Sequence, residues 1–173
     1  MGNTELIEYI GRNYLNTCKA RGHEYESRVI AKLHENGIPA ARGGALQRHT
    51  DIVAWGCVFI EVKASMPFND STYKFSFTPD QRKRGLLADL LVLYCADTTR
   101  FFVFEADYEA FYSAKDGKRK LRYQVSYTPN RSNRGGVSII TDEIMDVHED
   151  AWERVEKHRL RISASLKKDA QHY

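Results

Sequence analysis

The sequence has few cysteines, no long apolar run and no amino-terminal secretory pattern. Its three cysteines are odd in number and none belongs to a Cys-x-x-Cys pair, so neither a disulfide framework nor a zinc site is indicated. The longest apolar run, residues 90–96, is much shorter than the ~20 residues that cross a bilayer. These absences predict a cytoplasmic protein without membrane contact and with reduced thiols. They leave open whether a host, a virus or a mobile element encodes it.

The sequence also lacks a strong excess of charge of one sign. A net charge of +3 at pH 7 does not by itself indicate nucleic-acid binding. Residues 111–173 hold 13 Lys/Arg against 9 Asp/Glu, whereas residues 1–110 hold 13 against 14. The C-terminal third is therefore the expected electrostatic contact surface, although such an imbalance also occurs on ordinary solvated faces.

The length of 173 residues, with 42% hydrophobic and 28% charged residues, predicts one domain over residues 1–173. Helices are expected at residues 4–17, 24–35, 79–88, 107–112 and 149–168. Strands are expected at residues 38–42, 50–54, 57–64, 91–95, 101–104 and 121–127. Loops are expected at residues 65–73, 114–120 and 128–136. This alternation predicts an α/β fold, a mixed β-sheet flanked by helices.

Residues 50–64 contain the pattern that indicates chemistry. If the chain turns at Gly56, Ile52 faces Ile60 and Asp51 lies directly opposite Glu61. Five alternating apolar residues then fill the buried face: Ile52, Ala54, Val58, Ile60 and Val62. Asp51, Glu61 and Lys63 share the other face.

Two directly opposed carboxylates repel each other and destabilise a hairpin, so their presence needs a reason. A divalent cation provides one, because Mg²⁺ is commonly held by one or two carboxylates together with waters and phosphate oxygens. Lys63 projects to the same face, where it can position or deprotonate an attacking water or neutralise charge on a phosphate. The alternative is an ordinary exposed sheet face on which Lys63 pairs with Asp51 or Glu61.

Glu26 is a further candidate, because it lies on or beside the apolar stripe of the helix at 24–35. That stripe contains Ile30, Leu33 and Gly37, with Val29 alongside. A buried carboxylate must be paired or bind a metal. Glu26 is therefore expected to be another acidic residue of the metal site, directly or through water, unless it reaches solvent at the edge of the stripe.

Four segments together resemble the PD-(D/E)xK nuclease superfamily, and most closely its archaeal-type Holliday junction resolvases. They are Gly-x-x-x-Glu at 22–26, Ala-Arg-Gly-Gly at 41–44, Thr-Asp-Ile-Val-Ala at 50–54 and Ile-Glu-Val-Lys at 60–63. The resemblance continues weakly at 77–81, Phe-Thr-Pro-Asp-Gln, and no counterpart is identified for residues 1–20 or those after about 110. The proline that gives the superfamily its name is replaced by Thr50.

The resemblance implies a restriction-endonuclease-like core over about residues 22–110. It implies that Asp51, Glu61 and the backbone carbonyl of Val62 bind Mg²⁺, for which Mn²⁺ substitutes, and that Lys63 is the catalytic lysine. Glu26 is the acidic residue on the helix. Arg42 and Gln81 are accessory residues that contact the scissile phosphate or the metal-bound water. The implied activity is hydrolysis of DNA phosphodiester bonds to products with a 5′-phosphate.

Basic clusters outside the hairpin are candidate phosphate contacts. The expected DNA-binding residues are Arg42, Gln81, Lys83, Arg84, Lys118 and Arg119. The expected substrate is branched DNA, above all the four-way junction, and symmetric cutting of two strands predicts a homodimer. Residues 111–173 then pack on the core or form the dimer interface. Two alternatives remain: a restriction-type or other superfamily endonuclease acting on duplex DNA, and a DNA-binding module without activity.

Overall fold

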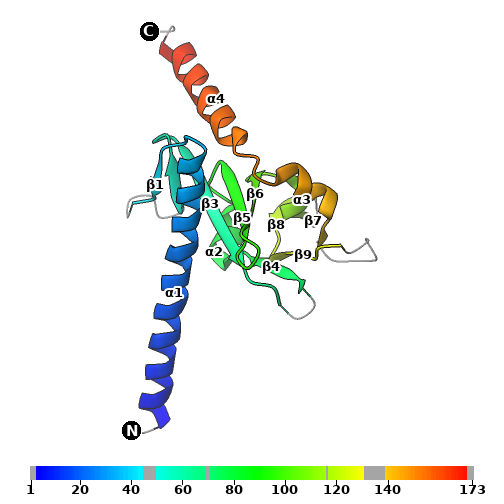
Figure 1. Ribbon diagram of the computed structural model, residues 1–173. Coiled ribbons are helices and arrows are strands. Elements are labelled where there is room, and N and C mark those ends of the chain that lie inside the picture. The colour runs from blue at the N-terminus through cyan, green and yellow to red at the C-terminus, as the bar shows by residue number, and fades with distance from the viewer. Residues whose placement is uncertain (1–2, 45–49, 69–70, 116, 131–138, 171–173) are drawn as a thin grey trace.

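The computed structural model of the protein describes residues 3–44, 50–68, 71–115, 117–130 and 139–170 (Figure 1). A five-stranded mixed sheet in the order β1-β2-β3-β5-β6 lies at its centre. The strands are β1 (Ala40–Arg42), β2 (Ile52–Ala54), β3 (Val58–Ser65), β5 (Leu90–Cys95) and β6 (Arg100–Glu105). Neighbouring strands are antiparallel, except that β3 and β5 are parallel. With helices packed on this sheet, the predicted α/β class is confirmed.

The register of the β2–β3 hairpin agrees with the prediction. Ile52 pairs with Ile60, and Ala54 pairs with Val58. Gly56 lies in the turn with a φ of 70°, a left-handed conformation that glycine adopts readily. The five alternating apolar residues of the hairpin are all buried, which directs the intervening side chains to the opposite face.

Helices α1 (Asn3–Glu35) and α4 (Glu153–Ala170) cover one face of the central sheet. Val29 and Leu33 of α1 are fully buried against it, as is Val155 of α4. Both helices extend beyond the sheet at opposite ends (Figure 1). No described helix is long and apolar enough to cross a membrane.

The prediction of two separate helices at 4–17 and 24–35 is wrong, because α1 is continuous from Asn3 to Glu35. Gly22 was expected to fall between the helices but lies within α1. A glycine costs a helix only about 1 kcal/mol relative to alanine, which is too little to end it here. The expected end of the helix is correct, and Gly37 follows it with a φ of 72°.

A second group of elements covers the opposite face of the sheet. It contains strands β4 (Tyr73–Ser76), β9 (Gln124–Tyr127) and β10 (Ile139–Ile140), the hairpin β7 (Tyr112–Lys115) and β8 (Lys118–Leu121), and helix α3 (Asp142–His148). Phe75, Val125 and Met145 from this group pack with Leu91 and Phe104 of the central sheet in a second buried cluster. Among the described residues of the predicted loop at 65–73, only Ser65 and Tyr73, at its two ends, belong to the named strands. The predicted loop at 114–120 is wrong, since it contains half of β7 and most of β8. Residues 131–138 of the predicted loop at 128–136 lie outside the described residues.

Helix α2 (Pro79–Arg84) is shorter than the predicted helix at 79–88. Thr78 and Gln81 form a reciprocal capping box at its start. The helix ends at Gly85, whose φ of 83° is left-handed. The short helix expected at 107–112 is a 3-10 turn at Glu109–Phe111. The final helix, expected at 149–168, begins four residues later at Glu153 and is preceded by α3, which was not predicted.

Candidate active site

A cleft of about 480 Å³ lies between the β2–β3 hairpin and α2. Asp51, Glu61 and Lys63 line it from the hairpin, and Gln81 and Arg84 line it from α2. Glu61 and Lys63 lie within β3, which is paired on one side with β2 and on the other with β5. The chemical groups that the sequence places on one strand face therefore lie in one cleft, two of them on a strand that is paired on both sides.

Asp51 lies directly before β2 and is fixed by backbone hydrogen bonds. Its Oδ2 accepts a hydrogen bond from the Val62 amide at 2.7 Å, and its own amide donates to the Ile60 carbonyl at 3.2 Å. Burial, and after it the negative charge of Glu61, raise the pKa of Asp51 to about 6. The Val62 amide and the charge of Lys63 oppose this shift in pKa. The carboxylates of Asp51 and Glu61 thus repel each other, as the hairpin register predicts.

Glu61 is only 4% exposed and is bound by two donors. The ammonium of Lys63 lies 2.7 Å from Glu61 Oε1. The side-chain amide of Gln81 donates a hydrogen bond to the same oxygen. The side-chain oxygen of Gln81, Oε1, accepts a hydrogen bond from the Thr78 backbone amide at 3.0 Å. The capping box of α2 therefore fixes the orientation of the Gln81 side chain toward Glu61.

Glu26 lies in an adjoining cleft that shares Asp51, Glu61 and Lys63 with the first. Its side chain is 16% exposed and pairs with Arg42, whose Nε lies 2.8 Å from Glu26 Oε2. Burial raises the pKa of Glu26, the charge of Asp51 adds to the rise, and Arg42 opposes it. Glu26 therefore lies close enough to the site to sense the charge of Asp51, while Arg42 neutralises it.

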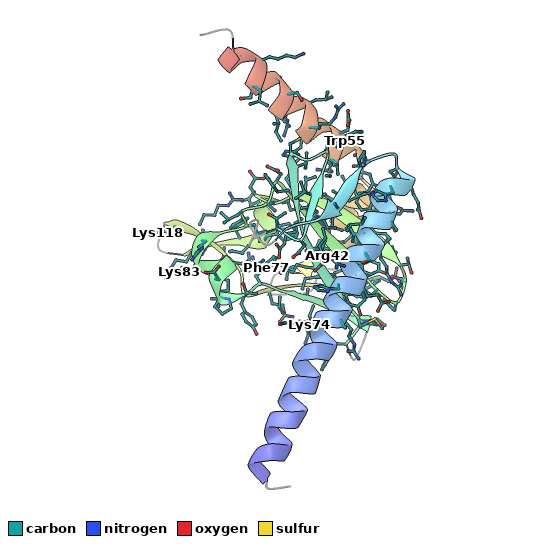
Figure 2. The ribbon with its side chains drawn as sticks, turned by 90° about the vertical axis from the view of Figure 1, so that its left-hand side faces the viewer. Arg42, Trp55, Lys74, Phe77, Lys83 and Lys118 are labelled. Carbon is teal, nitrogen blue, oxygen red and sulfur yellow. The ribbon has the colours of Figure 1, made fainter. Side chains whose placement is uncertain are left out.

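Arg42, expected to contact DNA, is held largely against α1. Besides Glu26, its guanidinium donates to the His23 carbonyl at 2.8 Å and to Ser27 Oγ at 3.0 Å. Its side chain is nevertheless exposed to solvent, and Figure 2 shows Arg42 beside α1. The contact that Arg42 makes near the site is its ion pair with Glu26, which holds the Glu26 carboxylate in place.

The donor groups at this site fit a magnesium ion. Hydrogen bonds and ion pairs within the described part of the chain engage one oxygen of each carboxylate, Oδ2 of Asp51 and Oε1 of Glu61. A strand residue directs its N–H and C=O to the same edge, so the Val62 carbonyl faces the Asp51 side of β3. Among the described residues, no three His, Cys, Asp or Glu side chains converge as metal ligands. Two carboxylates with waters and phosphate oxygens are sufficient for Mg²⁺.

The remaining residues expected to bind DNA lie on α2 and the β7–β8 hairpin, which contact each other. Lys83 and Lys118 are exposed and project at the same edge of the molecule (Figure 2). Arg84 lines the cleft and forms an ion pair with Asp80 at 3.2 Å. The guanidinium of Arg119 lies 3.9 Å from the centre of the Tyr112 ring. Lys83, Arg84, Lys118 and Arg119, called the basic edge below, thus form one surface beside the cleft.

Two residues that sequence reasoning missed border Lys63 and Gln81. The Phe77 ring lies 6.0 Å from Lys63 Nζ, and Thr78 lines the cleft. Thr78 had a signal in the sequence, since Thr-x-x-Gln is a capping-box pattern. Phe77 had none, because its place beneath Lys63 depends on how β4 packs against the central sheet.

Neither a protein-family model nor a curated protein matches the sequence. Among solved structures, the fold is similar to that of a bacterial homing endonuclease, I-Ssp6803I, with a TM-score of 0.56 and 20% identity over 87% of this chain and 96% of that chain. It is also similar to Hjc, a Holliday junction resolvase from Archaeoglobus fulgidus, with a TM-score of 0.40 and 14% identity over 74% of this chain and 89% of that chain. The first of these two likenesses shows that the chain shares the α/β fold of that homing endonuclease. The predicted fold is thereby confirmed.

Proposed function

We propose that the protein is a divalent-metal-dependent DNA endonuclease that hydrolyses phosphodiester bonds in this cleft. The observation that carries the proposal is the convergence of Asp51, Glu61 and Lys63 in one cleft, with the two carboxylates close enough for Glu61 to raise the pKa of Asp51. Repelling carboxylates with an adjacent lysine have a clear use in metal-assisted hydrolysis. The whole chain, residues 1–173, acts as one nuclease domain.

Asp51, Glu61 and the Val62 carbonyl would hold Mg²⁺ or Mn²⁺, and Glu26 would contribute through a water. Bound there, the metal supplies a Lewis acid and an activated water for in-line attack on phosphorus. Lys63 holds its ammonium at the cleft, where it neutralises charge on the phosphate oxygens or takes part in moving the proton of the attacking water. Gln81 orients Glu61 for these contacts.

The preferred substrate in this proposal is branched DNA, in particular a four-way junction. The helix that borders the cleft, α2, has only six residues, too few to place a recognition face in a major groove. The basic edge beside it suits phosphates, whose contacts position a protein without reading sequence. Symmetric cutting of two strands needs two sites, so the enzyme acts as a homodimer. The likeness to a homing endonuclease favours a second candidate, cleavage of a particular duplex sequence.

A substrate panel tests the activity and separates these candidates. Four-way junctions of several unrelated sequences, duplexes of matched length, flaps and single strands are incubated with the protein in Mg²⁺ and in chelator. We expect the junctions to be cut preferentially, with little dependence on sequence and only when the metal is present. Efficient cutting of one duplex sequence would support the second candidate. Cleavage in chelator, or no cleavage of any DNA, would overturn the proposed activity.

A further inference from the structure

A second groove, of about 500 Å³, lies on the outward face of the β4–β9 pair. Residues alternate along both strands, so Phe75 and Val125 point into the core while Lys74 and Ser126 point outward, opposite each other. The groove is lined by Lys74, Arg122, Tyr123, Gln124 and Ser126, together with Thr72 and Ser113. It therefore combines positive charge, hydrogen-bonding side chains and one aromatic ring.

Tyr123 is the most unusual part of this groove, because the residue is 62% exposed although its backbone is hydrogen-bonded. The Tyr123 carbonyl accepts a hydrogen bond from the Phe77 amide at 2.9 Å. The guanidinium of Arg82 lies 5.5 Å from the centre of the Tyr123 ring. An aromatic ring held in this way offers a flat apolar face to a ligand at little entropic cost.

Contacts through Phe77 and Arg82 link the groove to the active-site cleft. The Phe77 amide holds Tyr123, and the Phe77 ring lies 6.0 Å from Lys63 Nζ. Arg82 follows Gln81, whose side chain binds Glu61. Figure 2 shows Lys74 below Phe77, on the side of the molecule away from Trp55. These contacts place Tyr123 close to the cleft that holds Lys63.

We propose that this groove binds unpaired nucleotides of a DNA strand that leaves the cleft, with a base stacked on Tyr123 and a phosphate bound by Lys74. The inference rests on the proposed function, since it assumes DNA in the cleft. Bases within a duplex are stacked on one another, so a protein ring reaches a base face only where the strands separate. Gln124 and Ser126 provide the polar groups that contact base edges. The groove gives the enzyme a preference for DNA with separated strands, which a four-way junction offers only where base pairs at its branch point open.

The test compares the binding of two DNAs in chelator, where binding is measured without cleavage. One DNA is a duplex that ends in unpaired arms of about six nucleotides, and the other is fully paired and equally long. We expect Tyr123→Ala to weaken binding of the forked DNA by about tenfold or more and to leave binding of the paired DNA unchanged. Tyr123→Phe keeps the ring and should bind both as the native protein does. A 2-aminopurine in the unpaired arm should lose its stacking-dependent quenching only in Tyr123→Ala.

Trp55→Ala is the matched control, because Trp55 is also an exposed aromatic residue near an arginine. Its ring lies 4.8 Å from the Arg159 guanidinium, far from the groove (Figure 2), and its loss should not alter the binding of either DNA. Equal binding of forked DNA by native protein and Tyr123→Ala would overturn the inference, as would an equal loss on forked and paired DNA. Failure of the nuclease proposal is distinct, since it appears as absent cleavage in Mg²⁺ and does not depend on Tyr123.

Discussion

Asp51 and Glu61 form a costly pair in the metal-free protein. Both are largely withdrawn from water, and neither burial nor their mutual repulsion favours two negative charges. Lys63 and Gln81 compensate for the negative charge of Glu61. Asp51, by contrast, accepts its hydrogen bond from the uncharged Val62 amide. The unfavourable electrostatic energy of the site should therefore be measurable as a change in unfolding free energy when Asp51 is substituted.

The change Asp51→Asn should stabilise the metal-free protein at neutral pH. The native pKa of about 6 lies above the ordinary value of 3.8, so the folded protein binds a proton more tightly than the unfolded chain. The unfolding free energy of the native protein should consequently fall as pH rises from about 4 to 6. That of the variant should not show this fall, because Asn does not titrate. We expect a gain of about 1–3 kcal/mol at pH 7 that shrinks toward pH 4, measured by denaturant unfolding in chelator.

Asp107→Asn is the control, since it changes an exposed aspartate outside the clefts described above. Its unfolding curve should follow that of the native protein at every pH. An Asp51→Asn variant that is less stable than native at pH 7, or whose advantage does not change with pH, would show that Asp51 is not under electrostatic strain.

Among the elements of the fold, the segment that follows β1 helps to position Asp51 through Gly43. Its amide donates to the Asp51 carbonyl at 2.8 Å. A Cβ at Gly43 would overlap the carbonyl oxygen of Thr50, which is backbone and cannot rotate away. The structure shows that Gly43 accommodates the chain's own Thr50.

We predict that Gly43→Ala displaces the backbone at residues 50–51 and with it the Asp51 carboxylate. The expected results are a loss of about 1–3 kcal/mol in unfolding free energy and a marked loss of junction cleavage. Gly44→Ala is the matched control, because a Cβ there meets no atom of the described residues within 4 Å. Equal effects of the two substitutions would mean that the close approach at Gly43 does not position the site.

The elements that the sequence predicted best are those with one buried face. The β2–β3 hairpin has strict alternation and a glycine turn, so its register followed from sequence and so did the grouping of Asp51, Glu61 and Lys63. Strands β4 and β8 were missed because their recognition depends on partners: β4 pairs with the distant β9, and β8 reads Lys-Arg-Lys-Leu, with only Leu121 buried. The groove at Tyr123 was missed for the same reason, since pairing between distant segments creates it.

At the scale of the whole molecule, charge and shape suit a binding mode dominated by phosphates. The basic edge on α2 and β8 adjoins the cleft, and the projecting end of α4 lies away from it (Figure 1). Binding of this kind releases counterions and weakens steeply as salt rises. The net charge of +3 would not indicate this, because what matters is where the charges lie relative to the cleft.

The most direct test of the central claim measures cleavage and binding separately on one four-way junction, for the native protein, Glu61→Gln and Lys63→Ala. We predict that Mg²⁺ supports cutting by the native protein alone, that each variant cuts at least about 100-fold more slowly, and that both bind the junction nearly as well as native. In the proposed mechanism Lys63 acts on the reaction and contributes only one of several positive charges, which is why binding should survive its removal. Full cleavage by Glu61→Gln, or a loss of binding in Lys63→Ala that matches its loss of cleavage, would contradict the assignment of these residues to the chemistry.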